Sequence, residues 1–158
     1  MAGAKEVWSK AVMLALLAIA GRQRRDLAVL HFGGTPDELR AFRFPRGRAS
    51  PQDLLACATQ FYGGGTRFEP WMRAALGQID EAAFDKADVV IISDGLVGID
   101  PAVRAEWQRR RRERGMRCFA VLIGSREGAD LLTGLSDALL TLDDLADDGP
   151  ALQTIFAI

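Results

Sequence analysis

The chain has 158 residues, of which 49% are hydrophobic and 26% charged, and its formal net charge at pH 7 is −1. This length fits one domain spanning 1–158, and the hydrophobic share excludes an intrinsically disordered chain. The balanced charge argues against nucleic-acid binding, which usually needs a clear basic excess. Two cysteines, Cys57 and Cys118, lie far apart without metal-type spacing, so reduced thiols and a cytoplasmic location are expected.

The first apolar segment, Ala11–Ala20, follows Lys5 and Lys10 and has some features of a signal peptide. It is too short to span a bilayer as a helix, and no membrane association is expected. The residues around it contain no helix breaker and are apolar nearly all round. We therefore predict a core helix over Lys5–Gly21 that lies against a sheet.

Strands are indicated by short apolar runs that end at turn residues. Unbroken runs, typical of buried strands, occur at Asp26–Phe32, Asp88–Ser93, Arg117–Ile123 and Ala138–Leu142. Leu39–Phe44 alternates instead, with Phe42 and Phe44 on one face, and predicts an edge strand antiparallel to its predecessor.

Helices are predicted between these strands from their start signals. The segments run from Ser50-Pro51 to about Gln60, from Glu69-Pro70 to about Ala83, onward from Asp100-Pro101, over Glu127–Leu132 and over Pro150–Phe156. The expected inward residues are Trp71, Ala75, Ile79, Val103 and Trp107. This order predicts an α/β fold, a Rossmann-like three-layer sandwich with a mostly parallel sheet, one antiparallel edge strand and helices on both faces. Ligands of such sheets bind at the carboxyl ends of the strands.

Two polar motifs fall at this predicted edge of the sheet, Gly63-Gly64-Gly65-Thr66 and Ser93-Asp94-Gly95. Each alone is an ordinary turn sequence. Their order, a Gly-rich loop with Thr between two helices and then a buried strand ending in Ser-Asp-Gly, resembles the von Willebrand factor type A domain. The resemblance implies that Thr66 and Asp94 are metal ligands in an adhesion site for Mg²⁺ or Mn²⁺, for which their hard oxygen atoms are suited.

The remaining motif of that family, Asp-x-Ser-x-Ser after the first strand, is absent. Met1, Gly3 and Lys5 match the residues that follow it in many members, and the resemblance is greatest to the bacterial branch of ViaA and CoxE. It implies a protein-binding module that contacts an acidic residue of a partner, with a MoxR-type AAA+ ATPase as the expected partner.

The resemblance also implies that the central first strand, between Asp26–Phe32 and Asp88–Ser93, is missing. Buried strand edges would then lack backbone partners, which costs several kcal/mol. The two strands close up, or another chain supplies the strand, for example in a homo-oligomer, or the chain is poorly stable. Two protein oxygens hold Mg²⁺ only weakly. Another possibility is that Met1 is a wrongly assigned start, with the motif encoded upstream.

An α/β hydrolase acting on a phosphate or ester is the alternative, with Asp94 as base or metal ligand. Against it, the chain has no phosphate-binding glycine loop, dinucleotide fingerprint or nucleophile elbow. His31, the only histidine, is expected to be structural, although it lies near a strand end. Arg67 and Glu69 flank Thr66 in the sequence and could tune the metal site, but the charge preference of a helix N-terminus and solvation at the surface explain them equally well. A cluster of charged side chains is expected to form a solvated helix face: Arg109, Arg110, Arg111, Arg112 and Arg114.

Overall fold

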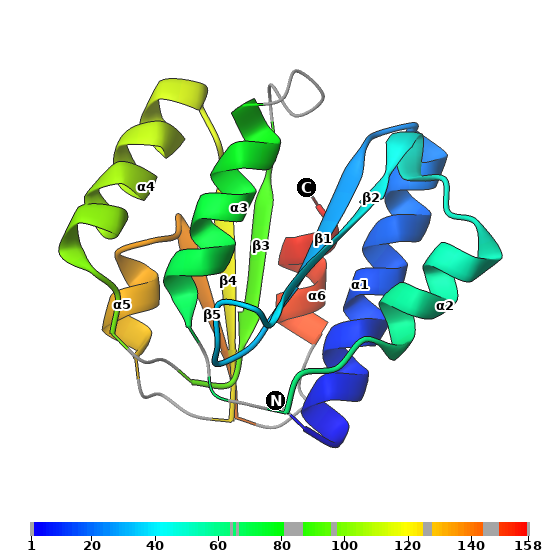
Figure 1. The fold of residues 1–158 in the computed structure, drawn as a ribbon, viewed down its shortest axis with the longest axis horizontal. Helices are drawn as coiled ribbons and strands as arrows, with labels where there is room; N and C mark the ends of the chain where they lie inside the picture. Colours follow the sequence, from blue (N-terminus) through cyan, green and yellow to red (C-terminus); the bar gives the residue numbers. More distant parts are fainter. Residues whose placement is uncertain are drawn as a thin grey trace.

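The fold is known from a computed structural model that describes residues 2–63, 65, 67–80, 87–95, 98–124, 128–143 and 149–157. Figure 1 shows the helices and strands, which alternate strictly from α3 onward. In chain order they are α1 (Ala4–Gln23), β1 (Leu27–Phe32), β2 (Leu39–Phe44), the 3-10 turn η1 (Pro45–Gly47), α2 (Pro51–Thr59), α3 (Phe68–Asp80), β3 (Val89–Ser93), α4 (Pro101–Arg114), β4 (Cys118–Ile123), α5 (Ala129–Thr133), β5 (Ala138–Leu142) and α6 (Gly149–Phe156). The strand bounds agree with the predicted ones to within one residue.

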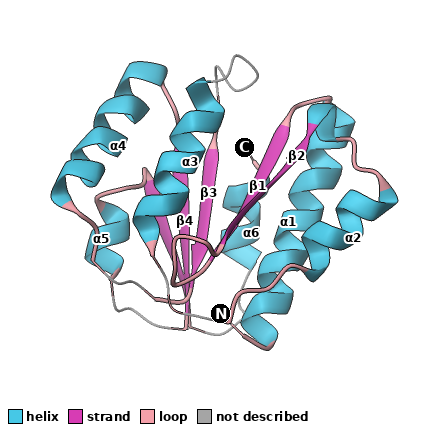
Figure 2. Ribbon diagram, in the orientation of Figure 1, coloured by secondary structure: helices cyan, strands magenta, loops and turns pink. Residues whose placement is uncertain are grey.

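The described strands form two sheets rather than one continuous sheet (Figure 2). β3, β4 and β5 are parallel, in the order β3-β4-β5, while β1 and β2 form a separate antiparallel pair with Leu27 opposite Phe44. The mixed α/β class and the antiparallel edge strand are therefore confirmed. Phe42 and Phe44 are buried and the intervening Arg43 is exposed, as the alternation predicts.

The predicted helix starts of α2 and α4 are confirmed by their capping hydrogen bonds. The Ser50 side chain accepts a hydrogen bond from the Asp53 N–H, and the Asp100 carboxylate accepts one from the Ala102 N–H at 2.7 Å. In both helices proline occupies the first turn, where its missing N–H has no intrahelical partner to lose. These signals are local, which is why the sequence alone locates them.

Helices pack on both faces of the parallel sheet. On one face, α3, α4 and α5 bury Trp71 and Trp107 against alternate residues of β4, including Cys118 and Leu122. On the other, α1 and α6 meet the intervening residues of β4, where Val121 is fully buried. Every described residue of β4 except Phe119 is buried, so β4 is the centre of the core.

α1 joins the two sheets on one side. It packs Val12 against the parallel sheet, and Met13 and Leu17 against the β1–β2 pair. The Ala11–Ala20 segment thus lies in a core helix, as predicted. Among the described residues, no helix combines the length and the apolar character needed to cross a membrane.

Candidate functional site

A cleft of about 730 Å³ separates β1 from β3. Both strands line it along their whole length, Leu27–Phe32 on one side and Val89–Ser93 on the other. Among the described residues β1 pairs only with β2 and β3 only with β4. The edges of β1 and β3 nearest each other (Figure 1) therefore carry backbone N–H and C=O groups without a strand partner.

The middle of the cleft is apolar on both sides, whereas charged residues such as Glu6 and Lys10 line it nearer its ends. α1 contributes Leu16 and Ile19 from one face, and α3 contributes Trp71 and Ile79 from the other. Because of this cleft, every residue of β1 is only half-buried, whereas its unbroken apolar run predicted a buried strand. The prediction was wrong because burial depends on what lies beside the strand, which its own residues do not encode.

Two polar atoms in the cleft lining are buried without a hydrogen-bond partner. They are the indole Nε1 of Trp71 and the amide Oε1 of Gln78, and both residues lie on α3. Buried polar atoms are almost always hydrogen-bonded, because an unpaired one costs about 1–3 kcal/mol. Both residues line the cleft, but these two atoms are themselves covered by protein, so the polar groups open to whatever enters are chiefly those of the strand edges.

Asp94 follows the carboxyl end of β3 and lines the cleft. Gly65, from the glycine-rich loop, lines the cleft too. The other predicted ligand, Thr66, lies outside the described residues. Ser93 beside Asp94 is buried, and its hydroxyl donates a hydrogen bond to the Gly95 carbonyl at 2.7 Å. The rim therefore holds one of the predicted metal ligands.

These residues by themselves do not fit a tight cation site. Across the described ranges, no three His, Cys, Asp or Glu side chains come together in a way that could hold a metal. Mg²⁺ prefers six oxygen ligands, and the Ser93 hydroxyl already takes part in a local turn with Gly95. Asp94 alone is too few protein ligands for tight binding.

The opening segment reaches the same rim. Gly124 follows β4 with φ +71°, and the Lys5 side chain lies beside it: a Cβ at position 124 would be 2.8 Å from Lys5 Nζ. Lys10, one turn further along α1, pairs with Glu6, and both line the cleft. A lysine at position 5, noted from the resemblance, therefore lies at the carboxyl end of the parallel sheet.

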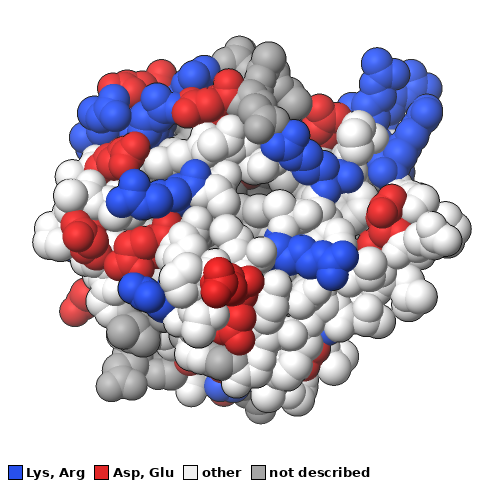
Figure 3. All heavy atoms as spheres, viewed as in Figure 1, with Lys and Arg blue, Asp and Glu red and all other residues white. Residues whose placement is uncertain are grey.

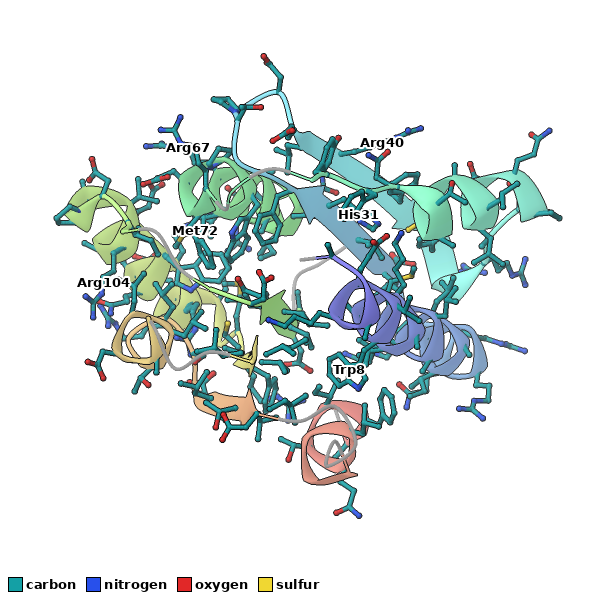
Figure 4. All side chains as sticks on the ribbon, turned by 90° about the horizontal axis from the view of Figure 1, so that it is seen from below. Trp8, His31, Arg40, Arg67, Met72 and Arg104 are labelled. Carbon is teal, nitrogen blue, oxygen red and sulfur yellow. The ribbon has the colours of Figure 1, made fainter. Side chains whose placement is uncertain are left out.

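The side chain of His31 projects from β1 toward Cys57 of α2 (Figure 4). Its Nε2 is 3.5 Å from the Cys57 thiol, and its ring meets Phe42 edge to face at 5.7 Å. Burial, with the nearby positive charges of Lys10 and Arg40, lowers the pKa of His31 to about 4. The imidazole is neutral at pH 7 and sits among core side chains, which supports the structural role over a catalytic one.

The charged residues near Thr66 make structural contacts. Glu69 accepts a hydrogen bond from the Asp100 N–H at 3.2 Å, and so links α3 to the start of α4. The Arg67 N–H bonds to the Gly33 carbonyl at 3.0 Å.

The arginines of α4 meet carboxylates of the chain itself: Arg109 with Glu113, Arg110 and Arg114 with Asp80, and Arg111 with Asp137.

Sequence reasoning missed the contribution of α1 and α3 to the cleft. The available signal was the unusual apolar breadth of the first helix, of which Leu16 and Ile19 line the cleft, Leu16 while also packing against the core. No comparable signal marked Gln78, a polar residue on a predicted helix.

Comparison with known proteins gives two archaeal relatives. No family model matches the chain. The chain is 27% identical over 154 residues to the uncharacterized protein MJ0811 of Methanocaldococcus jannaschii, an alignment that covers 94% of this chain and 33% of that protein. It is 29% identical over 146 residues to the uncharacterized protein MJ0077 of the same organism, covering 92% and 35%. The chain spans about a third of the length of the curated relatives it matches.

Proposed function

We propose that this chain is a protein-binding module of the von Willebrand type A kind, and that its cleft accepts an extended segment of polypeptide. The observation that carries this proposal is the pair of unpartnered strand edges on either side of one apolar cleft. A segment added there would continue the hydrogen bonding of both sheets, and the result would be one mixed sheet covered by helices. Addition of a strand to an exposed edge is a common mode of peptide recognition.

The dimensions and walls of the cleft suit such a segment. β1 has six residues and β3 five, so a strand between them needs about 20 Å. Successive side chains of a strand point to opposite faces, and here one face meets the apolar middle of α1, at Leu16 and Ile19, and the other meets α3 at Ile79. The fitting partner is therefore apolar at nearly every position, parallel to β1 and β3, as strands buried on both faces usually are.

A small apolar ligand is the competing occupant, because the volume is typical of small-molecule pockets. Such a ligand would leave the facing backbone groups of β1 and β3 unsatisfied. A peptide supplies an N–H and a C=O at each residue, which can pair with the two strand edges. The polypeptide therefore accounts for more of the cleft than an apolar ligand does.

The test is binding of a synthetic peptide of about seven residues, rich in Val and Ile with a lysine at each end. Binding should change the fluorescence of Trp71 and follow a saturable curve. A peptide of the same sequence with N-methylated backbone amides is the matched control, because it keeps the side chains and loses the hydrogen bonds. Equal binding of both peptides would refute strand addition and favour a purely apolar pocket.

A matched pair of variants on α1 locates the site. Ile19→Arg places a charge in the cleft, whereas Leu14→Arg lies on the exposed side of the same helix. Ile19→Arg should weaken the peptide at least tenfold, and Leu14→Arg should leave the affinity within about twofold. Equal loss with both variants would place the peptide elsewhere.

Metal dependence at the rim is a further part of the proposal. Asp94 with Thr66 would bind Mg²⁺ or Mn²⁺ weakly, and the ion would offer an open position to an acidic residue of a partner, for which a MoxR-type AAA+ ATPase is the candidate. Calorimetric titration with Mn²⁺, on the wild type and Asp94→Ala, measures this directly. A tight stoichiometric site, or weak binding that survives Asp94→Ala, would contradict it.

A further inference from the structure

Six arginines gather at the end of the molecule where α1 and β2 finish. We define this arginine corner by its members, all exposed: Arg22, Arg24, Arg25, Arg43, Arg46 and Arg48. Figure 3 shows basic side chains projecting from this corner, at the upper right. In a chain of net charge −1, such a concentration of one sign leaves the rest of the surface acidic on balance.

The corner is held together by close backbone packing. A Cβ on Gly47 would lie 2.1 Å from the Gly21 N, so only glycine lets η1 approach the last turn of α1 this closely. The Arg46 N–H donates a hydrogen bond of 2.6 Å to the Asp26 carboxylate, which fixes the turn further. The arginines near the two glycines are thereby brought together from two separate segments of the chain, residues 22–25 and 43–48.

Backbone conformation singles out two of these arginines. Arg24 and Arg46, with φ of 55° and 53°, are the non-glycine residues with positive φ among those the structure describes. A side chain in the left-handed region is unfavourable, and Gly or Asn is the usual residue there. Both positions nevertheless carry arginine, and strained residues tend to cluster at functional sites.

Ordinary structural roles explain only part of the corner. A cation in the last helical turn complements the helix dipole, which accounts for Arg22, and a charge on an edge strand discourages aggregation, which accounts for Arg43. Arg25 pairs with Asp88 at 3.6 Å. Within the described part of the chain, no carboxylate pairs with the side chains of Arg24, Arg46 or Arg48, whereas the arginines of α4 are mostly paired.

We propose that the arginine corner is a docking surface for an acidic segment of another protein, rich in Asp and Glu. Guanidinium groups bind carboxylates in a two-pronged geometry that lysine does not reproduce. A nucleic acid fits less well, because its long polyanionic backbone would meet the acidic remainder of the surface. The corner also lacks an aromatic platform, since the exposed large hydrophobic side chains of the part of the chain that the structure describes lie outside it: Val7, Leu14, Leu55 and Phe61. Arg24, Arg25 and Arg46 also line the cleft, at the end away from Asp94, but this inference does not rest on what the cleft binds.

The experiment measures fluorescence anisotropy with a labelled peptide of about eight alternating Glu and Asp residues. A Gln/Asn peptide of equal length and a single-stranded oligonucleotide serve as comparison probes. The acidic peptide should bind, and binding should weaken steeply with added salt. Equal binding of the Gln/Asn peptide, or tighter binding of the oligonucleotide, would overturn the proposal.

Variants separate the corner from general electrostatics. The double variant Arg24→Gly with Arg46→Gly should lower the affinity for the acidic peptide about tenfold. The double variant Arg22→Gln with Arg48→Gln should lower it by a similar factor while leaving the two positions of positive φ unchanged. The control, Arg109→Gln with Arg112→Gln on α4, removes the same charge and should change the affinity by less than about twofold. Equal weakening by the control pair would overturn the proposal. The double variant Arg24→Gly with Arg46→Gly should also have a melting temperature equal to or above that of the wild type. A lower melting temperature would mean that these two arginines stabilise the fold, and it would contradict their role in docking.

Discussion

The close approach of Gly47 to α1 predicts opposite effects for the same chemical change at two glycines. Gly47→Ala would place a Cβ 2.1 Å from the Gly21 N and 2.4 Å from the Ala20 carbonyl carbon, with φ at +63°. Both contacts are to helical backbone, which cannot rotate away. Gly77, on α3, has nothing within 4 Å of the added Cβ. Gly77→Ala therefore removes only the entropic disadvantage of a helical glycine.

The magnitudes follow from these distances. At Gly47 the left-handed backbone costs about 1 kcal/mol for alanine, and moving η1 off the helix adds about 1–3 kcal/mol of lost packing. Gly47→Ala should thus lower the free energy of unfolding by about 2–4 kcal/mol, whereas Gly77→Ala should raise it by about 0.5–1 kcal/mol. For a domain of this size each kcal/mol shifts the melting temperature by roughly 2–4 °C. Gly21→Ala, whose Cβ would lie 3.1 Å from the Gly47 carbonyl oxygen, should fall between the two.

Urea unfolding followed by circular dichroism at 222 nm measures all three variants. The expected order of stability is Gly77→Ala above wild type, and Gly47→Ala below Gly21→Ala. A Gly47→Ala protein as stable as the wild type would show that η1 does not lie against α1, and the arginine corner would lose its structural basis. A destabilised Gly77→Ala would show that α3 is packed on that face.

Three further predictions concern titration and local stability. Because the pKa of His31 is lowered to about 4 in the folded protein, the unfolded chain binds a proton at mildly acidic pH that the folded chain does not bind. The stabilising effect of the neutral imidazole should be fully present above pH 6.5, and the free energy of unfolding should fall by up to roughly 2 kcal/mol as the pH drops toward 4. This loss should be absent in His31→Gln. Burial raises the pKa of Cys57 to about 11 and of Cys118 to about 12, so iodoacetamide at pH 8 should label neither thiol before urea unfolds the protein; rapid native labelling would contradict their burial. Amide exchange should be faster in the half-buried β1 than in β4, and a peptide bound in the cleft should slow exchange in β1 and β3 but not in β5; equal exchange rates in β1 and β4 would refute the difference in burial.

Predictions from the sequence succeeded where the determinant is local. Ser50 and Asp100 predict the starts of α2 and α4 correctly, because the side chain of each accepts a hydrogen bond from a backbone N–H within three residues. Trp71, Ala75 and Ile79 face inward because their spacing repeats the helical period, and all three are buried. The antiparallel pairing of β2 with β1 likewise follows from a short connection between two apolar runs.

Features that depend on distant segments could not be predicted in the same way. The Glu69 carboxylate accepts a hydrogen bond from the Asp100 N–H, 31 residues away in the sequence. Gly47 packs against Gly21, although the two strands β1 and β2 separate them in the sequence. The open cleft is of this kind as well, because the residues of β1 read as a buried strand. Of the two predicted metal ligands, Asp94 lies at the expected strand end, and Thr66 lies outside the described residues.

The two sheets are joined by side chains rather than by backbone pairing, and this bears on what the cleft can do. On the α3 side the Phe32 ring packs on Trp71 at 5.6 Å, and at the amino ends of the strands Arg25 pairs with Asp88. The ion pair is half exposed on its arginine side and therefore adds little stability. A two-stranded sheet is itself only marginally stable, so the β1–β2 pair depends on α1 and α3 for its position. An added strand would hydrogen-bond to both sheets at once, so its binding energy would go directly into joining the two halves of the fold.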